Sequence, residues 1–312
     1  MDWLLEESQP AARYFALTDL LGREESDPEV AKASSQISMK GWAASILKAQ
    51  MPDGRWETKS PSTPLYGPKY TSTNWMALIL SDFGFTKASP RIRKVADLYF
   101  KEWLSLPSWG NAFNDEVCIV GNTARMMTKF GYGDDFRVRK LFDRLVEDQK
   151  EDGGWHCFRS DSGSLDCWEA LAAYASLPES LRTRKIKESI ERGAEFYLKR
   201  KLFDDGHRKY APWFRFHYPY HYYYDVLVGL DVLTRLGYGG DKRLRPALAI
   251  MKKKRTTGGT WLLDRVHPDI GAGAQYSMRR TPVPFALEVA GKPSKWITLT
   301  ALRVAKRVED AS

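Results

Sequence analysis

The heptapeptide Gln149-Lys-Glu-Asp-Gly-Gly-Trp155 occurs along this chain in three versions. An earlier version reads Gln50-Met-Pro-Asp-Gly-Arg-Trp56, and a later, degraded version reads Lys254-Arg-Thr-Thr-Gly-Gly-Thr-Trp261. A phrase that returns at long intervals is typical of a chain built from copies of one supersecondary unit. The sequence therefore predicts a repeat architecture.

A second pattern accompanies the first and identifies the repeated unit. Apolar stretches end at Gly84, Gly131 and Gly237, and a glycine in this position is a common C-cap of an α-helix. A short polar loop follows each glycine, with Asp or Ser-Pro residues that favour the start of the next helix. The basic-aliphatic-basic triplets lie just beyond such loops, at residues 91–93, 137–139, 185–187 and 243–245. Each unit is therefore predicted to be a helical hairpin of roughly 45 to 55 residues.

Two kinds of predicted helix alternate. Residues 72–83, 115–130, 164–177 and 221–236 are apolar on nearly every side, whereas 90–104, 135–149, 183–200 and 241–254 are charged on one face. A helix that is apolar all round is buried, and a one-sided helix lies at the surface. We therefore expect an all-α fold, an α/α toroid of concentric inner and outer helices, closed by a last helix at 293–308. Helices at 10–22 and from Ser26 to Leu47 precede the repeats.

Bulk properties fit a packed protein of one domain covering residues 1–312, with residues 1–35 as an N-terminal helical extension. Of the 312 residues, 43% are hydrophobic, and no long linker divides the chain. The acidic start does not resemble a secretory signal, and the apolar runs are too short to span a bilayer. The odd number of cysteines, 3, suits reduced thiols and a cytoplasmic location. The net charge of +9 is spread over several helices, which favours solvated outer faces over nucleic-acid binding.

The phrases with Gln, Gly and Trp resemble the QW motif of squalene and hopene cyclases. The paired helices are similar to those of the terpenoid cyclase and protein prenyltransferase β-subunit superfamily, over residues 36–312. The resemblance implies an α/α toroid in which the motif residues are structural, and it implies an apolar isoprenoid ligand. It also implies chemistry on that ligand, although the same toroid carries unrelated functions.

The acid motifs of these families are missing from the chain. Neither Asp-x-Asp-Asp, the proton donor of class II cyclases, nor the magnesium-binding Asp-Asp-x-x-Asp occurs in the sequence. Alignment of the inner helices on Trp75-Met-Ala-Leu78, Trp168-Glu-Ala-Leu171 and Leu227-Val-Gly-Leu230 places Thr73, Asp166 and Asp225 at equivalent positions, one turn inside the helix end. Asp225 and Asp166 are therefore the candidate catalytic acids, with His221 beside Asp225 as a possible partner. The alternative is that each aspartate only stabilises a helix N-terminus.

No metal and no cofactor are expected. The prenyltransferase β-subunits bind zinc through Asp-x-Cys and a later His, but here Asp166 and Cys167 are adjacent, so both reach one metal together with His221 only if the helix starts after them. The expected ligand contacts are aromatic side chains that can stabilise carbocations. They are Trp75, Trp168, Trp213, Phe216, Tyr220, Tyr222 and Tyr224. In the alternative interpretation these rings wedge neighbouring hairpins together.

The leading functional hypothesis is an isoprenoid-binding protein that resembles a class II, protonation-initiated terpene cyclase with a non-standard acid. A non-catalytic lipid-binding or scaffold toroid is the first alternative, because both acid motifs are missing. A carbohydrate-active α/α barrel enzyme is the second, since aromatic rings stack on sugars and a carboxylate pair such as Asp166 with Asp225 supplies acid and base. Peripheral contact of Lys252–Arg255 with a membrane stays open, and the sequence does not determine the oligomeric state.

Overall fold

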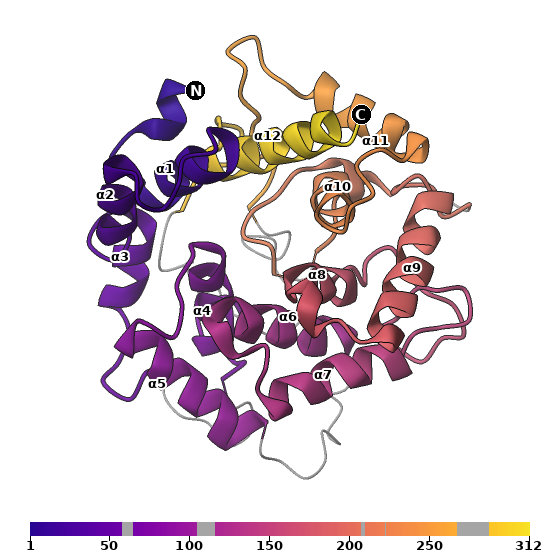
Figure 1. Cartoon of the computed structure of the whole chain (residues 1–312), viewed down its shortest axis with the longest axis horizontal. Coiled ribbons are helices and arrows are strands. Elements are labelled where there is room, and N and C mark those ends of the chain that lie inside the picture. The colour runs from indigo at the N-terminus through magenta and orange to yellow at the C-terminus, as the bar shows by residue number, and fades with distance from the viewer. Residues whose placement is uncertain (58–64, 105–115, 207–209, 222, 267–286) are drawn as a thin grey trace. The chain divides into compact units, whose positions relative to one another are not determined.

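The computed structural model describes residues 1–57, 65–104, 116–206, 210–221, 223–266 and 287–312 (Figure 1). Within these ranges the regular structure is helical, and β pairing is limited to isolated bridges between His217 and Arg265 and between Leu262 and Pro293. The predicted all-α fold is confirmed, and the closed toroid stays a prediction. None of the helices in these ranges is both long enough and apolar enough to cross a bilayer.

The chain forms two compact units, each assembled from separate stretches of sequence. Unit 1 consists of residues 1–99, 217–219 and 255–306, and unit 2 consists of residues 100–216, 220–254 and 307–312. The helices of unit 1 are α1 (Pro10–Phe15), α2 (Pro28–Gln36), α3 (Gly41–Lys48), α4 (Thr73–Asp82), α5 (Pro90–Leu98) and most of α12 (Lys295–Asp310). Those of unit 2 are α6 (Val117–Met127), α7 (Phe136–Glu147), α8 (Glu169–Ser176), α9 (Arg184–Lys199), α10 (Val226–Arg235) and α11 (Arg245–Lys253). Short 3-10 or π segments are η1 (Asp2–Leu5), η2 (Ala16–Leu20), η3 (Tyr99–Trp103), η4 (Thr128–Tyr132), η5 (Glu179–Leu181), η6 (Ala211–Phe214) and η7 (Lys242–Leu244).

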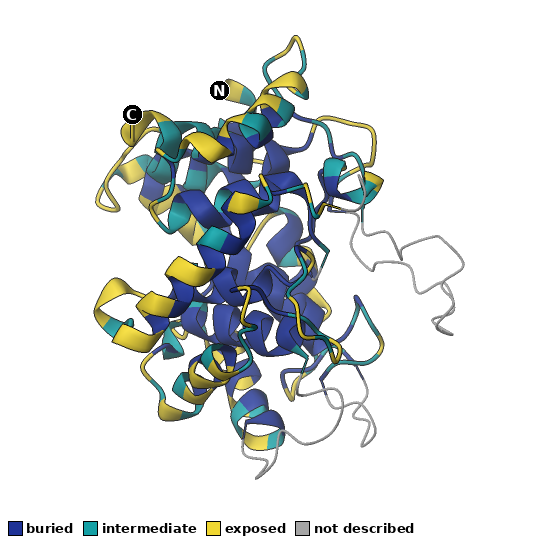
Figure 2. Cartoon of the chain, turned by 90° about the vertical axis from the view of Figure 1, so that its right-hand side faces the viewer, coloured by how far each residue is buried: buried dark blue, intermediate teal, exposed yellow. Residues whose placement is uncertain are grey.

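Buried helices alternate with one-sided helices, as the sequence predicts (Figure 2). Helices α4 and α6 are buried at every residue, whereas α5 buries only Ile92, Val95 and Ala96. Within unit 2, α6 packs against α7 and α8, and α8 packs against α9 and α10. Helices α6, α8 and α10 thus form the interior of unit 2, because their apolar residues leave no face that favours water.

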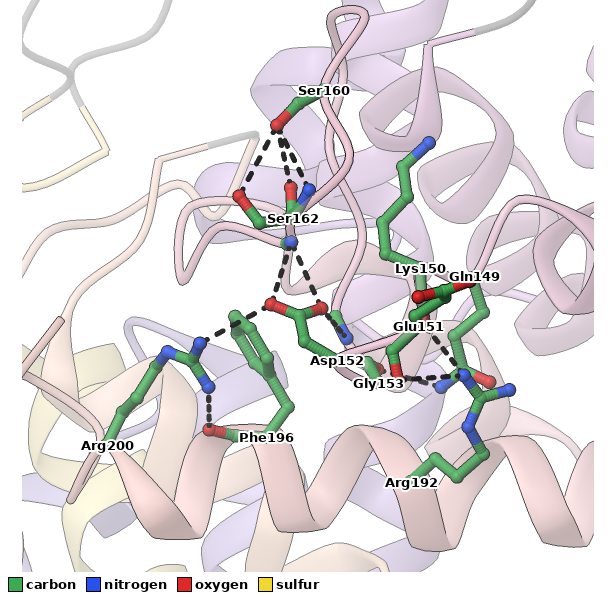
Figure 3. Close-up of polar contacts among 12 residues, drawn as sticks. Gln149, Lys150, Glu151, Asp152, Gly153, Ser160, Ser162, Arg192, Phe196 and Arg200 are labelled. Atoms are coloured by element: carbon green, nitrogen blue, oxygen red, sulfur yellow. Dashed lines mark hydrogen bonds and ion pairs between the residues drawn. The ribbon is translucent and has the colours of Figure 1, made fainter.

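The recurring phrase folds into the same turn in all three places. In the second copy, the Lys150 amide donates to the Gly154 carbonyl at 2.9 Å, and the Gly153 amide donates back to the Lys150 carbonyl at 3.0 Å (Figure 3). Equivalent pairs of bonds form around Met51 and around Thr256. Gly153 has φ +89, a backbone conformation that L side chains rarely adopt, which explains the glycine of the phrase.

The Gln and Trp of the phrase connect this turn to distant backbone. Gln149 Nε2 donates to the carbonyl of Gly153 at 2.8 Å and to that of Ser189 in α9 at 2.9 Å. Trp155 is fully buried, and its Nε1 donates to the Leu145 carbonyl of α7 at 2.7 Å. Gln50 and Trp56 make the corresponding bonds in unit 1, to Arg91 and to Ile46. The phrase therefore joins alternate helices, α3 to α5 in unit 1 and α7 to α9 in unit 2.

One predicted helix is wrong. The single helix expected from Ser26 to Leu47 is two helices, α2 and α3, which are separated near Gly41. Gly41 has φ +67, and a Cβ there would lie 2.4 Å from Gln9 Oε1. Gln9 Oε1 accepts a hydrogen bond from the Trp42 amide at 3.1 Å, so a side chain distant in sequence fixes the start of α3.

Candidate functional site

The candidate site lies inside unit 2, where α6 and α8 come into backbone contact. A Cβ on Gly121 of α6 would lie 2.6 Å from the carbonyl carbon of Glu169, the first residue of α8. Only glycine allows this approach without displacement of the neighbouring helix. The contact brings the polar side chains of α6 into the same buried region as Glu169.

Glu169 is the most unusual residue of this region. It is 0% exposed, and neither carboxyl oxygen has a hydrogen-bond partner in the part of the chain that the structure describes. Burial raises the pKa of Glu169 well above its usual value, and the negative charge of Cys157 raises it further, while Arg125 partly opposes the shift. These surroundings favour the protonated, uncharged acid.

Two side chains of α6 hold the backbone that precedes α10. Arg125 is 3% exposed, and its Nη2 donates to the Tyr220 carbonyl at 3.0 Å. Asn122 Nδ2 donates to the carbonyl of His221, itself 2% exposed. The guanidinium carbon of Arg125 also lies 5.2 Å from the centre of the Trp168 ring, a geometry that favours a cation–π contact.

Buried polar atoms without a partner are concentrated here. Besides Glu169, they include Asn122 Oδ1, Thr123 Oγ1, Arg125 Nε, Thr128 Oγ1 and Trp168 Nε1, which have no hydrogen-bond partner among the described residues. Most buried polar groups in folded proteins are paired. This concentration on α6 and at the start of α8 marks the region as the best candidate for a ligand site.

Three thiols adjoin Glu169. Cys167 Sγ donates to Cys157 Sγ at 3.6 Å, whereas Cys118 Sγ of α6 donates to Glu116 Oε2 at 3.6 Å and lies close enough to Cys157 to affect its pKa. Contacts with these two thiols hold the pKa of Cys157 well below its usual value, and the pKa values of Cys118 and Cys167 rise in return. Across the described residues, no group of three or more His, Cys, Asp or Glu side chains is arranged to hold a metal ion.

The three residues proposed from sequence as catalytic take different places in unit 2. Asp225 is 0% exposed and caps α10, since its Oδ1 accepts from the Val228 amide at 2.9 Å. Asp166 is exposed and accepts from Trp213 Nε1 at 2.7 Å. The expected positions of Asp166 and Asp225 one turn inside their helices are wrong, because α8 begins only at Glu169 and α10 only at Val226. His221 is held near α6 through its backbone, next to the candidate site.

The aromatic residues expected to contact a ligand belong to both units. Trp75 belongs to unit 1 and packs between Tyr66 and Tyr70, with ring centres 4.9 and 5.0 Å away. Within unit 2, Trp213 packs edge-on against Tyr224 at 6.1 Å.

The remaining rings of the expected set divide between packing and the site. The Tyr224 hydroxyl donates to the Leu202 carbonyl at 2.7 Å, and Phe216 lies under Lys254, with Nζ 5.0 Å from the ring centre. Trp168 and Tyr220 adjoin Arg125, while Tyr222 lies outside the described residues. Trp168 and Tyr220 are therefore the members of the set nearest to the candidate site.

Sequence reasoning missed Glu169, Arg125 and Asn122. A signal was present for Arg125 and Asn122, because each is a polar residue inside the otherwise largely apolar α6, whereas Glu169 is the first residue of α8. Charged residues are rarely fully buried unless they are paired or functional.

Comparisons with protein-family models, curated proteins and solved structures found no match to this chain.

Proposed function

We propose that this chain binds an apolar, isoprenoid-class ligand in unit 2 and transfers a proton to it from Glu169. The proposal keeps the protonation-initiated chemistry inferred from the sequence and assigns the acid to a different residue. One observation carries it: Glu169 is a fully buried carboxyl whose oxygens have no partner in the described structure and whose pKa is raised. A general acid must hold its proton at the working pH, and a buried carboxyl does so.

Arg125 provides the second requirement of the reaction. After the proton leaves, the Glu169 carboxylate must be stabilised in a region with little water, and the positive charge of Arg125 acts on it there. The proton would pass to a carbon–carbon double bond, and the ring face of Trp168 would stabilise the resulting cation. In this scheme Asp225 and Asp166 would have structural roles, Asp225 as a helix cap and Asp166 as a hydrogen-bond acceptor.

Deuterium transfer tests the proposal directly. The full chain is incubated in deuterated buffer with squalene or with farnesol dispersed in detergent, and the products are analysed by gas chromatography and mass spectrometry. We expect an isomerised or cyclised product that has gained one deuterium, since an acidic proton exchanges with the solvent before each transfer. Glu169→Gln is expected to retain ligand binding and to lose the product.

Glu179→Gln is the matched control, because Glu179 lies exposed on η5 of the same unit. It is expected to form product like the wild type. Equal product formation by Glu169→Gln would refute the role of the acid. Binding of the polyene without conversion by the wild type would instead support the lipid-binding, non-catalytic alternative.

A further inference from the structure

The loop that carries Cys157 is closed at its base by backbone contacts. The Ser164 amide donates to the Trp155 carbonyl at 2.8 Å, and a Cβ on Gly163 would lie only 2.5 Å from the Cα of Gly154. Residues 156–163 thus leave and rejoin the body of unit 2 at one narrow point. Cys157 lies just inside this point and Cys167 lies just beyond it.

Asp152 fixes the base of the loop (Figure 3). Its Oδ1 accepts from the amides of Gly154 and Gly163, each at 3.1 Å, and its Oδ2 lies 3.4 Å from Arg200 Nη2. These bonds join the second copy of the recurring turn to the far end of the loop. The two thiols are therefore held near each other by the fold.

We infer that Cys157 and Cys167 form a peroxide-oxidised thiol pair, in which Cys157 is the attacking group and Cys167 resolves the product into a disulfide. The sulfur atoms lie 3.6 Å apart, in hydrogen-bond contact. Cys157 is only half-buried, whereas Cys167 and Cys118 are 4% and 8% exposed, so a small oxidant meets Cys157 first.

The electrostatics of the thiols support this order of reaction. The contacts with Cys118 and Cys167 lower the pKa of Cys157 and favour its thiolate, the form that attacks peroxides. The contacts with Cys157, followed by burial, raise the pKa values of Cys118 and Cys167, which keeps both of them as thiols.

The reaction consumes one hydroperoxide and two thiols. The Cys157 thiolate attacks an oxygen of the hydroperoxide, the O–O bond breaks, and an alcohol or water leaves, which gives a sulfenic acid on Cys157. The Cys167 sulfur then attacks the Cys157 sulfur, the S–O bond breaks, and water leaves with the thiol proton. The two sulfurs lose two electrons, and the hydroperoxide gains them. A dithiol reductant reverses the change.

Peptide mapping of the full chain tests the pair. The reduced protein is treated with a slight excess of hydrogen peroxide, alkylated with iodoacetamide and digested with trypsin, which separates the cysteines into the peptides 151–159, 160–182 and 102–125. We expect a disulfide between peptides 151–159 and 160–182, two hydrogen atoms lighter than their sum and lost on treatment with dithiothreitol. Cys157 is expected to react at least about ten-fold faster than Cys118, because the thiolate is the reactive form.

Three variants complete the test. Cys167→Ser is expected to lose the disulfide and to accumulate a dimedone adduct on peptide 151–159, whereas Cys118→Ser is expected to keep the disulfide because Cys118 takes no part in the two chemical steps. Cys157→Ser is expected to leave peptide 160–182 unoxidised. A disulfide that joins mainly peptide 102–125 to either of the others, or three thiols that remain fully alkylated after peroxide, would overturn the inference. None of these readouts depends on the proton transfer assigned to Glu169.

Discussion

The carboxyl group of Glu169 is completely buried. The free-energy cost of burying this group depends on pH. The unfolded chain releases the proton of Glu169 near its usual pKa, whereas the folded chain retains it, because the folded pKa is raised. The contribution of Glu169 to stability is therefore greatest below its unfolded pKa and is lost as the pH rises toward the folded pKa. The loss is about 1.4 kcal/mol for each pH unit within that window.

Glu169→Gln removes this titration, since an amide binds no proton. The free energy of unfolding of the variant, relative to that of the wild type, is expected to increase between about pH 5 and about pH 7. Urea denaturation at several pH values, followed by circular dichroism, measures the difference. Parallel pH profiles of the two proteins would show that Glu169 ionises normally in the folded state.

Gly153 illustrates a second constraint that acts on a single residue. Gly153→Ala introduces a Cβ 2.4 Å from the Arg192 carbonyl oxygen at a residue with φ +89, whereas Gly237→Ala meets no atom within 4 Å at φ +93. Both substitutions strain the backbone by about 1 kcal/mol, and Gly153→Ala adds a clash of about 2 kcal/mol. Urea denaturation measures the free energy of unfolding of both variants, and the difference between them gives the contribution of the clash. Equal destabilisation of the two variants would show that the added Cβ of Gly153→Ala causes no clash.

Helix α10 depends on its cap. Asp225 Oδ1 accepts from the Val228 amide, so Asp225→Ala is expected to lower the free energy of unfolding by about 1 kcal/mol. Asp225→Asn keeps an acceptor oxygen and is expected to lie near the wild type in stability. The same variant separates the two roles considered for Asp225, because an amide can cap a helix but cannot donate a proton to an alkene. Thermal denaturation measures the stability of the variant, and the deuterium assay measures its product formation. Loss of product in a stable Asp225→Asn protein would show that Asp225, and not Glu169, donates the proton.

Long helices with strong periodicity were predicted well from the sequence. Residues 72–83 correspond to α4, Thr73–Asp82, and residues 293–308 correspond to α12, Lys295–Asp310. The break near Gly41 could not be predicted, because the Gln9 side chain that fixes it lies 33 residues away from Trp42. Glu169 was missed for a related reason. Its burial and its lack of partners arise from the contact between α6 and α8, and the pattern of α8 alone shows only an acid near a helix start.

Unit 1 as a whole is assembled around Trp296, which is 3% exposed. Its ring lies 5.1 Å from that of Phe83, 5.1 Å from that of Tyr218 and 6.0 Å from that of Phe15. These partners come from residues 1–99 and 217–219, and Trp296 comes from residues 255–306. One side chain thus contacts all three stretches of chain that make up the unit.

Trp296→Ala is expected to lower the free energy of unfolding of unit 1 by about 3 to 5 kcal/mol, because it leaves a large void among packed rings. Met39→Ala is the control in the same unit, since Met39 is 72% exposed and little contact is lost. Urea denaturation followed by near-ultraviolet circular dichroism measures both. A loss below about 1 kcal/mol for Trp296→Ala would show that the three stretches are held together elsewhere.

The recurring turn has a consequence for how this chain can be engineered. Gln50 reaches a carbonyl 41 residues ahead, and Gln149 reaches one 40 residues ahead, through the same amide nitrogen. The near-equal sequence spans and the matching bonds of the two glutamine side chains give the two heptapeptides the same role in joining helices. We expect a chimaera in which the sequence of residues 149–155 replaces that of residues 50–56, with Arg55 retained because it is buried and pairs with Glu57, to form the same turn and the same bond to the Arg91 carbonyl.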